Sequence, residues 1–112
     1  MPAAERTITV DQPIEGVFDF LANGRNAPTW RSAVVDIERI SGDGTVGTVY
    51  RQGVRGPGGR RVAADYEVTA WERPTRLAFR AIAGPVRPEG EYVLESLGDA
   101  TIVTFSAIAR PW

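Results

Sequence analysis

The sequence predicts a single α+β domain, with an antiparallel sheet of about seven strands and two short helices after the first strand. Three observations lead to this fold class. Alternating β-branched residues at 6–10 give way to apolar residues at helical spacing, and from residue 35 onward the apolar pattern has a period of two. Glycine and proline turn signals then recur at short intervals, which favours an antiparallel meander. At 112 residues the chain has the length of one domain.

Two helices separate the first strand from the rest of the sheet. Pro13 is typical of a helix start, and Val17, Phe18 and Leu21 follow it at helical spacing. Pro74 and the Gly84-Pro85 pair stop two of the later strands. The expected elements are, in order, a strand over 6–10, a helix from 13 that ends at 23–24, a helix over 26–30, and strands over 35–40, 46–54, 62–72, 76–83, 91–97 and 101–109.

The composition excludes several kinds of chemistry. The chain has no cysteine, which excludes disulfides, thiolate nucleophiles and zinc–thiolate sites. It has no histidine, so the usual general base near neutral pH is missing, and no lysine that could form a Schiff base. Any acid–base chemistry must therefore come from Asp, Glu, Tyr or ordered water. We expect no metal site and no cofactor.

Charge and hydropathy limit the partners of the chain. The formal net charge is -1, which gives no basic surface for nucleic acid. The N-terminal residues lack an apolar run of signal-peptide length, and no segment has the apolar length of a membrane span. The expected location is the cytoplasm.

Five segments of the sequence form a recognisable series. They are 10–21 (VDQPIEGVFDFL), 28–30 (PTW), 44–50 (GTVGTVY), 68–79 (VTAWERPTRLAF) and 92–104 (YVLESLGDATIVT). In this order they resemble the START-like (helix-grip) superfamily of polyketide cyclases and lipid-transfer proteins. They look like its paired-helix start, its tryptophan after the second helix, its Val-Gly strand, its Glu-x-Pro turn and its final hairpin. The resemblance implies a curved sheet whose concave face holds an apolar small molecule. It concerns structural positions and transfers no catalytic residue.

The end of the sequence departs from that family. Its members finish with a long C-terminal helix across the concave face, whereas this sequence stops at 109–112, just past the last expected strand. Either the sequence is a piece of a longer protein or the short form is native. A native short form would leave a larger apolar face than soluble monomers tolerate. In that case we expect a homodimer through the uncovered sheet face, or a partner protein.

Strand alternation places two sets of side chains on opposite faces of the sheet. Arg51, Asp65, Glu67, Arg80 and Glu95 suit the solvent face. The inward set mixes large aromatic and small residues, which leaves room for a ligand, and its tyrosines add hydroxyls to an apolar wall. The ordinary alternative is a packed core with tyrosine tips in water. The inward set is Val46, Thr48, Tyr50, Gln52, Ala64, Tyr66, Val68, Ala70, Leu77, Phe79, Ala81, Ala83, Tyr92, Leu94, Val103, Phe105 and Ala107.

Eight of these and neighbouring residues are candidates for ligand binding. For Trp30 a pocket wall and a core plug between helix and sheet are equally good interpretations. Thr48 and Gln52 are candidates for hydrogen bonding to a ligand carbonyl, although a solvated strand end is the more ordinary role for Gln52. The candidates are Trp30, Thr48, Tyr50, Gln52, Tyr66, Phe79, Tyr92 and Phe105.

Two further patterns have a functional and an ordinary interpretation. The Gly-rich, basic segment 55–61 suggests a phosphate cradle, but it lacks the lysine and the following helix of a phosphate loop, so a plain hairpin is favoured. Asp65 and Glu67 lie two residues apart on one strand, as a catalytic carboxylate pair would, but a charged outer face is the simpler interpretation.

Three functions are compatible with these sequence features. The first is a polyketide cyclase/dehydratase-like enzyme that acts by confinement, with Tyr50, Tyr66 or Tyr92 orienting or protonating an enolate. The second is a non-catalytic carrier of a lipid or other apolar metabolite. The third is a protein-interaction module that uses the open sheet face. No catalytic residue is assigned.

Overall fold

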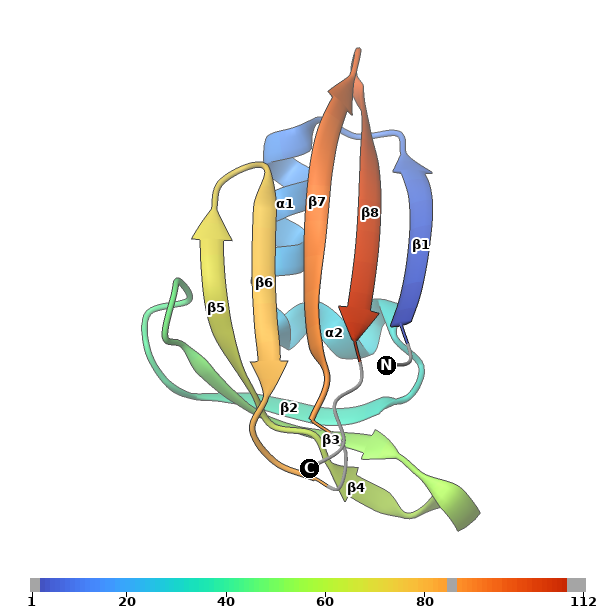
Figure 1. The fold of residues 1–112 in the computed structure, drawn as a ribbon, viewed down its shortest axis with the longest axis vertical. Coiled ribbons are helices and arrows are strands. Elements are labelled where there is room, and N and C mark those ends of the chain that lie inside the picture. Colours follow the sequence, from blue (N-terminus) through green and yellow to red (C-terminus); the bar gives the residue numbers. More distant parts are fainter. Residues whose placement is uncertain (1–2, 85–86, 109–112) are drawn as a thin grey trace.

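The computed structural model describes residues 3–84 and 87–108 as eight strands and a short helical segment after the first strand (Figure 1). The elements are β1 (Ala3–Val10), α1 (Ile14–Ala22), η1 (Gly24–Asn26), α2 (Ala27–Trp30), β2 (Val34–Ser41), β3 (Val49–Arg55), η2 (Pro57–Gly59), β4 (Arg61–Ala63), β5 (Tyr66–Glu72), β6 (Arg76–Ala81), β7 (Glu89–Leu97) and β8 (Ala100–Ile108).

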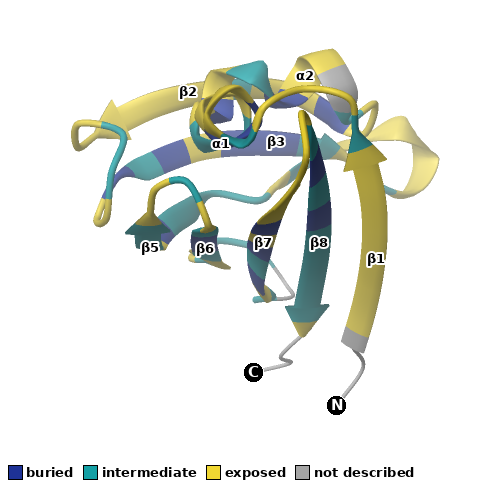
Figure 2. Ribbon diagram, turned by 90° about the horizontal axis from the view of Figure 1, so that it is seen from above, coloured by how far each residue is buried: buried dark blue, intermediate teal, exposed yellow. Residues whose placement is uncertain are grey.

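All strand pairs are antiparallel, and the seven longer strands form one sheet in the order β1-β8-β7-β6-β5-β3-β2, with β4 paired to β3. The sheet curls, and α1 and α2 lie on one face of it, behind β6–β8 in Figure 1. Buried residues concentrate on the inner strands, whereas β1 and β2, the two edges, are mostly exposed (Figure 2). The predicted α+β fold, with a curved sheet and two short helices after the first strand, is confirmed.

The core lies between α1 and the concave face of the sheet. Val17 and Phe18, the predicted apolar side of α1, are buried against apolar residues from β3, β5, β6, β7 and β8. The Phe18 ring meets the Trp71 ring edge-on, with centroids 5.6 Å apart. Because apolar burial contributes about 25 cal/mol per Å² of surface removed from water, this contact holds the helix on the sheet.

A β-bulge in β5 corrects the predicted face of two residues. Val68 pairs with Phe79, but the next paired residue is Ala70, opposite Ala78, so Thr69 is the extra residue. A bulge reverses the alternation beyond it. Trp71 therefore packs on the core, and the prediction that Ala70 points inward is wrong.

The strand predicted over 62–72 is two strands, β4 and β5, because the strand is interrupted at Ala64 and Asp65. The Ala64 amide donates to the Gln52 carbonyl, and the Asp65 carboxylate accepts a hydrogen bond from the Gln52 backbone amide at 3.1 Å. A side chain thus replaces a backbone partner at the break. The Asp65 carboxylate therefore serves as a hydrogen-bond acceptor for the backbone of β3. This contact supports neither the catalytic pair with Glu67 nor a side chain that is simply solvated.

The start of the strand predicted over 46–54 also differs. Gly44 and Gly47 have positive φ, a conformation that favours glycine, so β3 begins only at Val49. Val46 is 59 % exposed, and its predicted inward position is wrong.

The outer face carries charged side chains, as predicted. Glu67 pairs with Arg80 across β5 and β6 at 2.8 Å, and Arg61 forms a two-point pair with Asp36 of β2. The segment 55–61 is a hairpin between β3 and β4, in which Arg61 is engaged with Asp36.

The described part of the structure ends with β8 at Ile108, and none of the helices within it is long and apolar enough to cross a membrane. The predictions about 109–112 and the end of the last strand lie outside the described residues.

Candidate functional site

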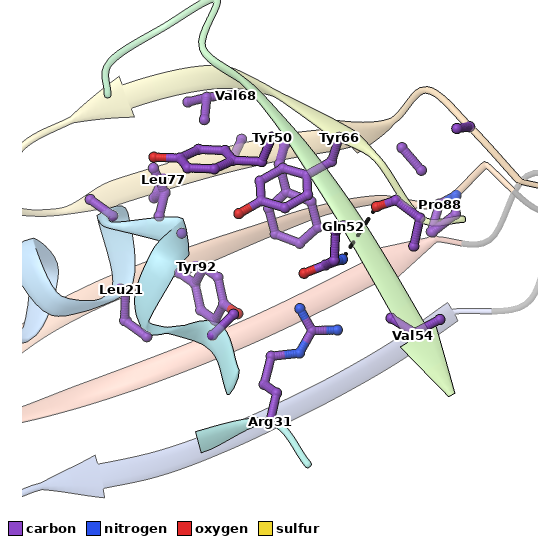
Figure 3. Close-up of a pocket in the computed structure, with 18 of the residues that line it drawn as sticks. Leu21, Arg31, Tyr50, Gln52, Val54, Tyr66, Val68, Leu77, Pro88 and Tyr92 are labelled. Carbon is purple, nitrogen blue, oxygen red and sulfur yellow. Dashed lines mark hydrogen bonds between the residues drawn. The ribbon is translucent and has the colours of Figure 1, made fainter. Parts of the chain in front are cut away.

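A cavity of about 390 Å³ lies between the helical segment and strands β3–β7 (Figure 3). Its volume falls in the range of small-molecule pockets, roughly 300–1,000 Å³. The wall is mostly apolar. It is lined by Leu21, Ala22, Asn23, Gly24, Ala27, Arg31, Tyr50, Gln52, Val54, Val62, Ala63, Ala64, Tyr66, Val68, Leu77, Ala78, Phe79, Ala81, Ala83, Pro88 and Tyr92.

Five aromatic rings, one from each of five neighbouring strands, form a continuous series on the concave face. Tyr50 stacks on Tyr66 at a centroid distance of 5.1 Å, and Tyr66 meets Phe79 at 5.6 Å. The series continues from Phe79 to Tyr92 at 6.0 Å and from Tyr92 to Phe105 at 5.0 Å. Each ring of the series therefore packs against at least one neighbouring ring, at distances typical of aromatic pairs.

Gly24 brings the helical segment close to this wall. A Cβ at Gly24 would lie 2.5 Å from the Tyr66 hydroxyl oxygen and 2.8 Å from a ring carbon of Tyr50. No larger residue fits there without moving a tyrosine. The sequence indicated only that Asn23-Gly24 ends a helix.

Two of the cavity tyrosines have shifted acidity. Burial raises the pKa of the Tyr92 hydroxyl to about 12, and the Arg31 charge acts in the opposite direction. Burial, followed by the nearby Tyr50 and Tyr92, raises the pKa of Tyr66 well above its ordinary value of 10.0. Both hydroxyls stay protonated near neutral pH and are weaker acids than a free tyrosine. They suit hydrogen bonding to a ligand better than proton donation to an enolate.

Gln52 has an unsatisfied acceptor on the cavity wall. Its Nε2 donates to the Ala64 carbonyl oxygen at 3.2 Å, whereas its Oε1 is buried with no hydrogen-bond partner among the described residues. Because a carbonyl oxygen can only accept a hydrogen bond, the atom facing the Ala64 carbonyl must be the amide nitrogen Nε2, and the other atom is Oε1. Gln52 is 4 % exposed, so the expectation of a solvated strand end is wrong. The free atom is an acceptor, which suits a ligand donor rather than a ligand carbonyl.

Arg31 is a cavity residue that the sequence did not indicate. Its backbone is held on both sides of the end of α2, since its amide donates to the Ala27 carbonyl at 2.8 Å and its carbonyl accepts from Val34 at 3.1 Å. From there the side chain points toward Gln52 and Tyr92 (Figure 3). The cavity wall among the described residues includes no Asp or Glu. The one signal for Arg31 in the sequence was its position directly after the short expected helix over 26–30.

The structure brings five of the eight candidates together on the cavity wall, namely Tyr50, Gln52, Tyr66, Phe79 and Tyr92. Their role in ligand binding stays a prediction.

Of the other three candidates, Thr48 and Phe105 are not among the described residues that line the cavity. Thr48 is fully buried, and its hydroxyl accepts a hydrogen bond from the Gly44 amide at 2.8 Å, so it holds the turn before β3. The Phe105 ring belongs to the aromatic series and contacts the rings of Phe79 and Tyr92. The side chain of Trp30 lies outside the described part of the structure.

Solved structures with the same fold come from several organisms. The protein TTHA0849 from Thermus thermophilus is 20% identical with a TM-score of 0.85, covering 99% of this chain and 75% of that one. DR_A0006 from Deinococcus radiodurans is 19% identical with a TM-score of 0.81, covering 99% and 84%. The ZhuI aromatase/cyclase from Streptomyces sp. R1128 is 19% identical with a TM-score of 0.78, covering 99% and 70%. At these identities the likeness establishes the fold.

The family comparison goes further than the fold. A search of curated proteins found no match. The sequence does match, over residues 1–112, the family described as polyketide cyclase / dehydrase and lipid transport. Because the match spans the whole sequence, the chain belongs to the polyketide cyclase / dehydrase and lipid transport family.

Proposed function

We propose that this protein binds an apolar small molecule in the cavity between the helical segment and β3–β7. The observation that carries the proposal is the cavity of about 390 Å³ that remains although five aromatic rings gather on the concave face. Small alanines on the wall, such as Ala64, Ala81 and Ala83, leave this room. An apolar wall with a few polar groups is typical of small-molecule sites.

The chemistry of the wall favours binding over acid–base catalysis. The chain has no histidine and no lysine, and the described wall includes no carboxylate that would act as a general base. The protonated tyrosines supply hydrogen bonds without a proton shuttle. A carrier of an apolar metabolite is therefore the function that the geometry supports best.

A cyclase-like reaction is the second candidate, and the family description favours it. Folding a reactive chain needs confinement and orientation more than a strong base, and well-oriented reactants gain up to roughly 7–11 kcal/mol of barrier reduction. In that case Tyr66 and Tyr92 orient a carbonyl as hydrogen-bond donors. A product that differs from the ligand supplied would distinguish this role from carriage.

The test is fluorescence titration with N-phenyl-1-naphthylamine, a neutral apolar probe. Wild-type protein is expected to bind it saturably. Ala81→Phe places a ring inside the cavity and is expected to abolish binding. Val93→Phe adds a ring on the opposite face of the sheet, where Val93 is 42 % exposed, and is expected to leave binding unchanged.

Equal binding by the two variants, both shown to be folded by circular dichroism, would contradict the proposal. Dimerisation through the uncovered part of the sheet, and use of that face by another protein, stay predictions.

A further inference from the structure

The cavity has a polar end formed by two side chains from different elements. Gln52 comes from β3 and Arg31 from the residue that ends α2, and their polar groups face each other in Figure 3. The remainder of the described wall is mostly aliphatic and aromatic. A ligand would therefore be oriented by this end.

Gln52 Oε1 requires a hydrogen-bond donor. The atom is buried on a residue that is only 4 % exposed, and no group in the described part of the chain donates to it. A buried acceptor left without a partner costs about 1–3 kcal/mol. A ligand hydroxyl at this point would remove that cost.

Arg31 supplies the opposite chemistry. Its guanidinium is always charged and only donates hydrogen bonds, so it recognises anionic oxygens, and a carboxylate matches its planar geometry. The Arg31 charge acts on two cavity hydroxyls. It lowers the pKa of Tyr66 and of Tyr92, whereas burial raises the pKa of both. Among the described lining residues, Arg31 is the one with a charged side chain.

We infer that the cavity selects an apolar hydroxy acid, which places its carboxylate at Arg31 and donates its hydroxyl hydrogen to Gln52 Oε1. This inference rests on the proposed function, because it assigns the ligand class of the same cavity. The apolar part of the ligand lies against the aromatic wall formed by Tyr50, Tyr66 and Phe79.

The test uses three compounds that differ only at the polar end, measured by isothermal titration calorimetry. They are 2-naphthylglycolate, which has both groups, 2-naphthylacetate, which lacks the hydroxyl, and 2-naphthylmethanol, which lacks the carboxylate. The glycolate is expected to bind most tightly. Each missing group is expected to weaken binding about tenfold, the usual scale for one hydrogen bond to a buried or charged partner.

Variants assign each group to its residue. Arg31→Gln is expected to weaken both acids about tenfold or more and to weaken 2-naphthylmethanol much less. Gln52→Leu is expected to remove the preference for the glycolate over the acetate. Arg51→Gln is the matched control, because Arg51 is exposed on β3, directly beside Gln52 in the sequence. It is expected to change none of the affinities.

A measurement on the unmodified protein covers the case that a variant does not fold. Binding of the two acids is expected to weaken as salt is raised, whereas that of the alcohol is not. Equal affinity for acids and alcohol, with no difference in salt dependence, would overturn the inference and leave the proposed function intact. So would binding of N-phenyl-1-naphthylamine without binding of any of the three compounds. Failure of all four probes to bind would overturn the proposed function as well.

Discussion

Replacing Gly24 by alanine tests how closely the helical segment packs on the tyrosine wall. The new Cβ would lie 2.5 Å from the Tyr66 hydroxyl oxygen and 2.8 and 2.9 Å from two carbons of the Tyr50 ring. All three distances are shorter than ordinary van der Waals contact. Gly24 is buried, and both tyrosines are fixed by stacking on each other, so neither moves without disturbing the cavity.

Overpacking of this kind usually costs about 1–3 kcal/mol, and we expect Gly24→Ala to lower the free energy of unfolding by that amount. Urea denaturation followed by circular dichroism measures it, and a lower midpoint with an unchanged slope is the expected form. Because the tyrosines move, affinity for N-phenyl-1-naphthylamine is expected to fall as well. In the Gly24→Ala/Tyr66→Phe double variant the nearest clash is removed, so the two effects are expected to be non-additive.

Gly16→Ala is the matched control. Gly16 lies inside α1, and a Cβ there would have no atom within 4 Å. Alanine is favoured over glycine in a helix interior by about 1 kcal/mol, so this variant is expected to be more stable than the wild type. If Gly24→Ala were as stable as Gly16→Ala, the close packing of Gly24 on the tyrosines would be refuted.

Two further predictions concern the tyrosines and the break between β4 and β5. Because burial raises the pKa of Tyr92 to about 12 from an unfolded value near 10, the stability that its protonated form contributes is complete below pH 10 and is lost as the pH rises toward 12. Ultraviolet titration of the phenolates is expected to show a step near pH 12 that is lost in Tyr92→Phe. If the difference between the wild-type and Tyr92→Phe titrations instead showed a step near pH 10 in folded protein, the raised pKa of Tyr92 would be contradicted. Asp65→Ala removes the acceptor of the Gln52 backbone amide and is expected to cost about 1–3 kcal/mol in urea denaturation. Asp65→Asn keeps an acceptor oxygen and is expected to recover most of that loss, so equal losses in the two variants would argue against the hydrogen bond.

The fold followed from the sequence because its signals are local. The helical spacing of Val17, Phe18 and Leu21 and the period of two in the later strands are fixed by neighbouring residues. The three errors in the strands arose where this local rule fails. The extra residue at Thr69 and the side-chain partner of Gln52 interrupt the alternation without a compositional signal. Gly47 has a positive φ, but a glycine alone does not mark a strand end, since Gly53 lies within β3.

The cavity residues were predicted correctly only where side chains alternate regularly along a strand. Tyr50, Gln52, Tyr66, Phe79 and Tyr92 line the cavity because each lies on a regular stretch of strand and shares the concave face. Thr48 precedes its strand, and its hydroxyl serves a turn instead.

The sequence by itself determined the fold class, the aromatic character of the concave face and the absence of histidine, lysine and cysteine chemistry. The tertiary structure alone decided that Arg31 faces Gln52, that Gln52 Oε1 is buried with no donor among the described residues, and that Gly24 touches two tyrosines. These contacts join elements far apart in the chain. They depend on how the helical segment lies across the curled sheet, and no periodicity within a single segment encodes that placement.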